Sequence, residues 1–192
     1  MTTVSEAIKK RHSARAFKDR DVDLETVKSI IQIAKQSPSG VNTQPWNVYV
    51  LSGDARDKLV NEATSRYDQG KMDGQEYLVY PKEMPDWYKE RRRAVGWAMY
   101  GAIGIEKGDT EKMMAQGRKN YEFFGAPVGI FITVKNCVGP NGWGHVGHFI
   151  QNVCLLAIEN GLATCLQEAW AELPKLVSCL LYTSDAADEH GC

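Results

Sequence analysis

Hydrophobic residues recur at helical spacing in the first third of the chain. In residues 23–36 apolar side chains fall every three or four positions, and Asp23 is placed to cap the N-terminus of a helix. Residues 4–11 predict a short helix with Ser5 as its N-cap. Residues 54–68 predict a second amphipathic helix, so this part of the chain is largely helical.

Apolar runs typical of strands stand at residues 47–53 and 126–134, and the second run is the clearest buried strand in the chain. A long apolar helix is predicted over residues 144–162, and the Asn-Gly pair near its end is a good C-terminal signal. Residues 163–170 predict a short strand or turn. The hydrophobic pattern therefore predicts a chain that contains both helices and strands.

Residues 70–120 are rich in Trp, Tyr, Met and Arg and turn helical only in their second half. The basic run at residues 89–93 could be a nucleic-acid patch. Because the run is short and the net charge of the chain is close to zero, we expect the solvated face of a helix and no nucleic-acid partner.

The end of the chain does not follow these patterns. After Val177 the sequence "SCLLYTSDAADEHGC" shows no helical stripe, no strand alternation and no turn chemistry. Its "CLLYTSDAADE" resembles the conceptual translation of a sequencing-adapter read-through. We therefore expect residues 178–192 to be a non-native tail without stable packing, with a natural C-terminal segment missing; a frayed polar tail is the alternative.

Length and composition restrict the class of protein. A chain of 192 residues with 43% hydrophobic and 24% charged residues suits one soluble domain, which we place at residues 1–177. The net charge of −1 gives no general attraction to nucleic acid or membrane, and no apolar run is long enough to span a bilayer. Five cysteines without a CxxC pair argue for a reducing, cytoplasmic setting.

Two short segments carry candidate chemistry. In "KKRHSARAF", Arg11, His12, Ser13 and Arg15 lie within five residues, and paired guanidiniums suit a phosphate group. A surface charge cluster is the alternative. No Walker loop and no GxGxxG after a strand is present, so a phosphate would be bound by arginine side chains.

The second segment, "SPSGVNTQPW", places carboxamides in a loop that prolines make rigid. An amide offers one acceptor and two donors on a neutral group, which matches the edge of a planar heterocycle such as flavin. Gly40 could let the backbone approach a flat ring closely. The alternative is a loop whose amides bond only to its own backbone. The histidines show no metal-ligand spacing, so no metal site is expected.

Together these motifs resemble the FMN-dependent nitroreductase family. The segments "RHSARAF", "SPSGVNTQPW", "FFGAPVGIFITV" and "QNVCLLAIENGLATCLQEAW" occur in the order of the family and at its approximate spacings. The resemblance covers about residues 4–177. It implies an α+β fold with a mostly antiparallel central sheet flanked by helices, and an obligate homodimer with FMN at the interface.

The resemblance also implies roles for individual residues. The four residues of the arginine cluster match phosphate and ribityl contacts, and the loop that holds the flavin ring matches Pro38, Ser39, Gly40, Asn42 and Gln44. Leu166, Gln167 and Glu168 match the segment over the ring, where the backbone N–H of Glu168 would address flavin N5. The family often has proline at position 166 and an acidic or amide residue at position 145, where this chain has His145.

The function implied is the transfer of hydride from NADH or NADPH, through the flavin, to nitroaromatics, quinones or similar flat electrophiles by a ping-pong mechanism. No side chain is expected to be catalytic, because the cofactor carries the chemistry. Residues 70–120 would form a lid that selects substrates, although Trp87, Trp97 and Tyr100 could equally pack in a core or interface. The alternatives are a flavin-cleaving or dehalogenating enzyme and a non-catalytic flavin-binding protein.

Overall fold

The structure is a computed structural model of the chain and describes residues 2–185. The chain divides into two compact units, each built from two separate segments. The first unit comprises Met1–Lys58 with Phe123–Leu166, and the second comprises Leu59–Glu122 with Gln167–Cys192. One domain over residues 1–177 stays a prediction.

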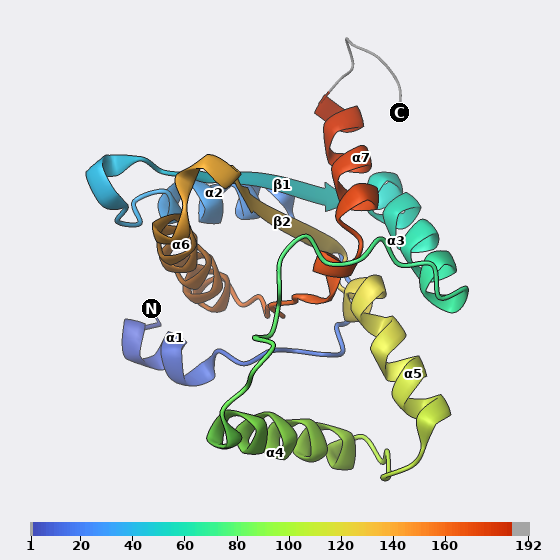
Figure 1. Cartoon of the computed structure of the whole chain (residues 1–192). Helices are drawn as coiled ribbons and strands as arrows, with labels where there is room; N and C mark the ends of the chain where they lie inside the picture. The colour runs from blue at the N-terminus through green and yellow to red at the C-terminus, as the bar shows by residue number, and fades with distance from the viewer. Residues whose placement is uncertain (1, 186–192) are drawn as a thin grey trace. The chain divides into compact units, whose positions relative to one another are not determined.

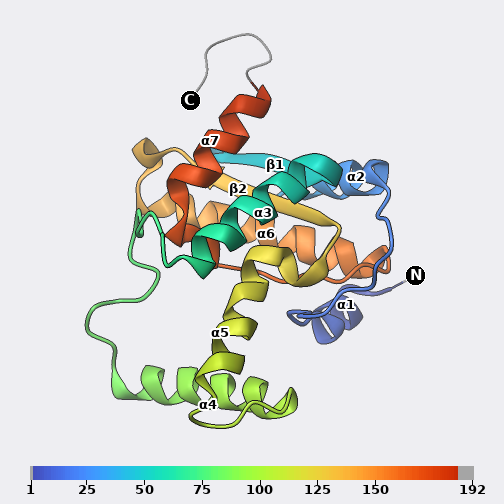
Figure 2. The ribbon, with the colours of Figure 1, turned by 90° about the vertical axis from the view of Figure 1, so that its right-hand side faces the viewer.

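The first unit holds both strands of the described chain and the longest helix (Figure 1). Its elements are α1 (Val4–Lys10), α2 (Leu24–Ala34), the 3-10 turn η1 (Gly40–Asn42), β1 (Trp46–Ser52), β2 (Val128–Val134), η3 (Asn136–Val138) and α6 (Pro140–Glu159). Strands β1 and β2 pair antiparallel, with Trp46 opposite Val134 and Val48 opposite Ile132. Figure 2 shows α6 beside the two strands, and its side chains provide most of the core.

That core forms where the apolar stripes of α2 and α6 meet one face of the strands. Its buried members are Ile30, Ala34, Trp46, Val146, Phe149, Val153 and Ala157. The ring of Trp46 stacks on that of Phe149 at a centroid distance of 4.9 Å. Burying aromatic rings of this size contributes about 2–3 kcal/mol each, so this stack fixes the start of β1 on α6.

The predicted helix boundaries are mostly confirmed. Asp23 caps α2 by accepting hydrogen bonds from two backbone N–H groups. The first helix is capped by Thr3 and not by Ser5, because the Thr3 hydroxyl and the Glu6 carboxylate form a reciprocal capping box. The long helix α6 ends at its Asn-Gly pair, where Gly161 has a φ of 72° that favours glycine.

Strand β2 is less buried than its sequence suggests. Only Gly129 is buried, and the other residues of β2 are half-buried. A Cβ on Gly129 would lie 2.7 Å from a ring carbon of Phe123, so the phenyl ring covers the strand at this point. The apolar side chains of β2 therefore pack against neighbours on both faces of the strand, but most of them keep part of their surface exposed.

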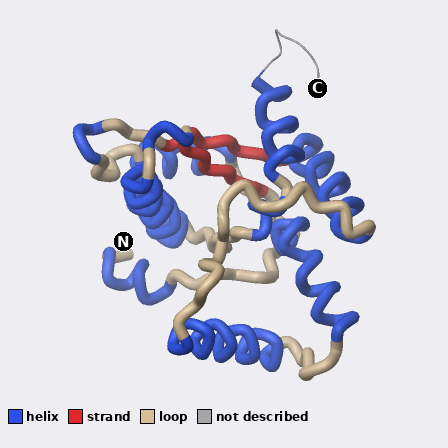
Figure 3. The backbone as a smooth tube through the Cα atoms, viewed as in Figure 1, coloured by secondary structure: helices blue, strands red, loops and turns tan. Residues whose placement is uncertain are grey.

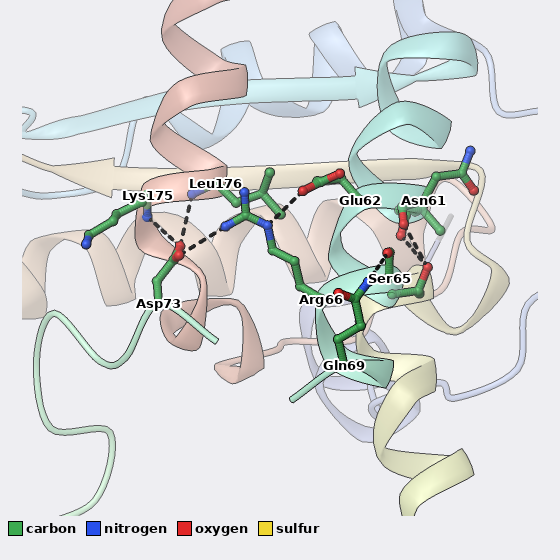
Figure 4. A network of polar contacts seen from close by, with 10 residues as sticks. Asn61, Glu62, Ser65, Arg66, Gln69, Asp73, Lys175 and Leu176 are labelled. Carbon is green, nitrogen blue, oxygen red and sulfur yellow. Dashed lines mark hydrogen bonds and ion pairs between the residues drawn. The ribbon is translucent and has the colours of Figure 1, made fainter. Parts of the chain in front are cut away.

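The second unit is mainly helical. Its elements are α4 (Asp86–Ala102), α5 (Thr110–Arg118), the 3-10 turn η4 (Ala169–Glu172) and α7 (Pro174–Asp185), while α3 (Gly53–Asp68) and η2 (Lys119–Gly125) cross between the units. A long loop of residues 69–85 joins α3 to α4 and appears as a tan tube in Figure 3. Its start is fixed by Asp73, whose carboxylate accepts hydrogen bonds from Arg66 and from the first N–H groups of α7 (Figure 4).

The helix α7 corrects our expectation for the end of the chain. We expected no regular structure after Val177, yet the helix continues to Asp185 and Leu181 is 3% exposed. The apolar residues between Leu173 and Leu181 recur at helical spacing once Pro174 starts the helix. The remainder of the expected tail, residues 186–192, lies outside the described residues. Its non-native origin stays a prediction.

Candidate functional site

The loop "SPSGVNTQPW" is anchored to α6 at both of its ends. At its start, the amide of Asn152 donates a hydrogen bond of 2.7 Å to the hydroxyl of Ser37, which in turn donates to the Ala34 carbonyl. At its end, Trp46 stacks on Phe149. Ser37 is buried, so its hydroxyl needs these partners. The two anchors fix where the loop leaves α2 and where it enters β1.

Two histidines of α6 hold the backbone between these anchors. Nδ1 of His148 donates to the Pro38 carbonyl at 3.3 Å, and Nε2 of His145 accepts from the Gly40 N–H at 3.2 Å. A Cβ on Gly40 would lie 3.1 Å from that Nε2 atom. A larger residue at this position would push the imidazole of His145 back by a few tenths of an ångström, a constraint that the sequence did not predict.

The middle of the loop is strained. Val41, Asn42 and Gln44 have φ values of 46°, 57° and 44°, in the left-handed region that non-glycine residues rarely adopt. Each such residue costs about 1–2 kcal/mol, with asparagine at the lower end. The anchors on α6 offset this cost, since each hydrogen bond contributes about 0.5–1.5 kcal/mol. Strain held in this way is typical of binding and catalytic loops.

The strained backbone brings the two carboxamides together. Nε2 of Gln44 donates to Oδ1 of Asn42 at 2.8 Å, and the backbone N–H of Gln44 donates to the Ser39 hydroxyl. Within the described residues, the N–H groups of the Asn42 amide and the carbonyl oxygen of Gln44 have no partner. Both residues are exposed. The loop therefore presents one amide donor and one amide acceptor side by side, as the imide edge of a planar heterocycle requires.

The arginine cluster lies beside the segment that leads to Leu166. Ser13 forms a parallel bridge with Thr164, and the N–H of Ala14 donates to the Thr164 carbonyl at 3.0 Å. Nδ1 of His12 donates to the Lys10 carbonyl, which leaves Nε2 for another partner. These contacts place the arginine cluster beside Thr164, which the sequence alone did not predict.

The charges of the two arginines are available for an anion. Neither Arg11 nor Arg15 forms an ion pair within the described residues. Burial raises the pKa of Cys165, and the charge of Arg15 partly opposes that rise. Burial likewise raises the pKa of Cys154, where Arg11 acts in the opposite direction. The positive charges of both arginines therefore lie close enough to the chain around residue 164 to affect these thiols. Both thiols stay protonated near neutral pH.

Gln167 and Glu168 belong to the second unit, where neighbouring side chains fix their backbone. Nε2 of Gln167 donates to the carbonyl of Asn120 at 2.9 Å, and the hydroxyl of Tyr121 donates to the Ala169 carbonyl at 3.2 Å. The amide of Gln167 therefore holds the segment in place. The backbone N–H of Glu168 has no hydrogen-bond acceptor within the described residues, so it remains able to bind a ligand.

Comparisons with known proteins identify the family of this chain. Residues 8–182 match the model of the nitroreductase family. The chain is 34% identical over 179 residues to a 4-nitrobenzoate reductase of Nocardioides sp. (strain LMS-CY), covering 90% of this chain and 72% of the relative. The chain belongs to the nitroreductase family.

Two crystal structures of nitroreductases have the same fold. The FMN and NADPH-dependent nitroreductase NfnB from Sphigopyxis sp. strain HMH is 38% identical with a TM-score of 0.89, covering 94% of this chain and 81% of that one. The FMN-dependent nitroreductase NfnB from Mycobacterium smegmatis, in complex with NADPH, is 28% identical with a TM-score of 0.88, covering 93% and 80%. The predicted nitroreductase-like α+β fold is confirmed, although the described part of its sheet has two strands.

Sequence reasoning about this nitroreductase missed the polar face of α6. His145, His148 and Asn152 stand three and four residues apart and so share one side of the helix. The available signal was the spacing of these polar residues in an otherwise apolar helix, and metal ligation is not the reason for it. Within residues 2–185 no cluster of metal-ligating side chains occurs, and no helix is long and apolar enough to cross a membrane.

Proposed function

We propose that this nitroreductase transfers hydride from NADH or NADPH to nitroaromatics, quinones or similar flat electrophiles by a ping-pong mechanism in the cytoplasm. As a member of its family, the chain is an NAD(P)H-dependent oxidoreductase with FMN as cofactor. The observation that carries the proposal is the strained loop on α6, which offers one unpaired amide donor and one unpaired amide acceptor.

The residues of the chain fit the two ends of this cofactor. FMN, when bound, accepts hydride at N5 and passes it to the second substrate. Arg11 and Arg15, with His12 and Ser13, would bind the phosphate and ribityl chain through charge-assisted hydrogen bonds.

The loop would hold the other end of the cofactor. Asn42 and Gln44 would bind the pyrimidine edge of the ring, and Pro38, Ser39 and Gly40 would lie against it through the backbone that α6 fixes. The N–H of Glu168, in the segment that follows Leu166, would donate to N5. None of these groups needs to exchange a proton with the substrate.

We also propose a homodimer in which two copies complete each flavin site. A hydrogen bond from the Ala14 N–H joins the arginine cluster to Thr164, and others join the loop 37–44 to α6. Within the described residues no hydrogen bond joins the loop directly to the arginine cluster. A second copy would bring the loop of one chain to the arginine cluster of the other, as the family resemblance implies.

The test uses FMN and riboflavin, which share the ring but differ in the phosphate. Replacing Arg11 and Arg15 by glutamine should weaken FMN binding by about 3–6 kcal/mol in total, at about 1.5–3 kcal/mol for each lost charge-assisted bond. Riboflavin affinity should be unchanged. Exposed Arg20→Gln is the matched control. Equal losses for both flavins would contradict the phosphate assignment.

Activity is tested on the same preparations. The purified protein should be yellow and should bleach when NADH or NADPH is added, and 4-nitrobenzoate should restore the colour. A protein that binds FMN but is not bleached by either nucleotide would favour the alternative of a non-catalytic flavin-binding protein.

A further inference from the structure

One face of α4 has the spacing of a buried helix face but carries basic and aromatic residues. Its members follow the i, i+3, i+4, i+7, i+8, i+11 pattern of one helix face, and they are Lys89, Arg92, Arg93, Gly96, Trp97 and Tyr100. No residue of α4 is buried in the described chain. Together with residues 80–84, this face lines a cavity of about 790 Å³ in the second unit.

The basic end of the cavity is arranged to bind an anion. The guanidinium of Arg92 lies 4.1 Å from the ring centroid of Tyr80. A guanidinium stacked in this way keeps its N–H groups for a carboxylate or phosphate. Arg93 and Lys82 also line the cavity, and neither forms an ion pair within residues 2–185.

The other charged residues nearby do not cancel the positive charge of Arg92, Arg93 and Lys82. Lys89 is paired with Asp86, at 3.1 Å, on the exposed surface. Glu83 is the acidic residue of the lining, against four basic residues in the same lining. The cavity is therefore locally positive although the whole chain has a net charge of −1.

The other end of the cavity suits a flat ring. Trp97 and Tyr100 form an edge-to-face pair at 5.9 Å, and Trp97 is 42% exposed. Gly96 stands between the arginines and this pair, where a Cβ would meet nothing within 4 Å. Without a side chain at Gly96, a ring can reach the helix backbone beside Trp97.

We infer that this cavity binds a planar aromatic ring that carries an anionic group, with Arg92 and Arg93 on the anion and Trp97 against the ring. Two reactants of the proposed function have this chemistry: an aromatic acid such as 4-nitrobenzoate, and the phosphorylated adenosine end of NADPH. The identity of the reactant rests on the proposed function, whereas binding at the cavity does not require FMN.

The experiment compares the double variant Arg92→Gln/Arg93→Gln with wild type and with Arg91→Gln. Arg91 is the matched control because it is exposed on the same helix, lies over Trp87 and does not line the cavity. Calorimetric titrations use 4-nitrobenzoate against neutral nitrobenzene, and adenosine 2′,5′-bisphosphate against adenosine. Each is run with and without added FMN. All three arginines are exposed, so the variants should fold.

The double variant should bind one of the two anionic probes at least about tenfold more weakly, as expected for the loss of a charge-assisted hydrogen bond. Its affinity for the neutral partner and the affinities of Arg91→Gln should stay unchanged. The probe that is affected identifies the source of the anion. If both anionic probes bind as before, or if Arg91→Gln weakens them equally, the inference is overturned. A protein that binds these probes but not FMN would instead overturn the proposed function.

Discussion

Replacing Asn42 by glycine should make the bound flavin harder to reduce. The Asn42 amide accepts from Gln44, and its own N–H groups have no partner within the described residues, so they can donate to a flavin carbonyl. Negative charge accumulates on that edge of the ring on reduction, and a fixed donor stabilises the reduced form more than the oxidised form. Glycine removes the donor and readily adopts the φ of 57° found at this position.

The size of the effect follows from the two kinds of hydrogen bond. A bond to a charged group contributes about 1.5–3 kcal/mol and one to a neutral group about 0.5–1.5 kcal/mol, so the difference is about 1–1.5 kcal/mol. For a two-electron couple, 1.4 kcal/mol corresponds to about 30 mV. The reduction potential should therefore fall by about 20–30 mV, and hydride transfer to the flavin should slow.

The assay is an equilibrium dye titration of the flavin potential in the purified holoprotein. Val41→Gly is the matched control, because Val41 is strained like Asn42, is 98% exposed and has no polar group to offer the ring. It should leave the potential unchanged and raise the melting temperature, since glycine relieves about 1 kcal/mol of left-handed strain. If Asn42→Gly keeps the wild-type potential, or if Val41→Gly shifts it equally, the donor role of Asn42 is refuted.

Three further predictions concern stability. Asn152→Ala should cost about 1–2 kcal/mol, or about 2–8 °C in melting temperature, because it removes the donor to buried Ser37, and an unchanged melting temperature would show that this bond does not anchor the loop. Leu181→Ala should lower the free energy of unfolding by about 2–5 kcal/mol, because Leu181 is buried. A loss below about 0.5 kcal/mol, the size of an ordinary surface effect, would show that this segment is not packed after all. Burial, with smaller effects of Glu172 and Tyr67, raises the pKa of Tyr121 to about 12, from 10.0. Because the pKa is higher in the folded state, the stabilising effect of the Tyr121 hydroxyl should be complete below pH 10 and lost as the pH rises through 12. Denaturant titrations at several pH values should show this fall in the free energy of unfolding, and Tyr121→Phe should abolish the pH dependence.

The regular elements were predictable where local signals agreed with tertiary packing. For α2, the apolar stripe and the Asp23 cap point to the same boundaries, and the structure confirms them. At α1 the signals were ambiguous, since Thr3 and Ser5 are both good caps and only Thr3 has a glutamate three residues later. At α7 the apolar spacing is recognisable only when Leu173 and Leu176 are counted with the residues after Val177, and the helix depends on the packing that buries this face.

The residue types of the proposed site can be read from the sequence, but the way in which the structure holds them cannot. Side-chain types alone suggested amides for a heterocycle and arginines for a phosphate. The loop of residues 37–46 is held by α6, which begins about a hundred residues later in the chain, and pairings of that range leave no local signal. Residue types alone therefore suggested candidate ligand groups but gave no sign of the residues that support them.

The conformation of the loop depends on those supports and not on its own sequence. A β-branched residue such as Val41 disfavours positive φ, so an isolated peptide of residues 37–46 would avoid the geometry seen here. The bonds from Asn152, His148 and His145 fix the backbone before the strained residues, and the Trp46–Phe149 stack fixes it after them. With both ends held, the residues between have few ways to span the gap, and the observed turn sets Asn42 and Gln44 side by side. The proposed flavin contacts of this loop would thus depend on one face of α6 as much as on the loop itself.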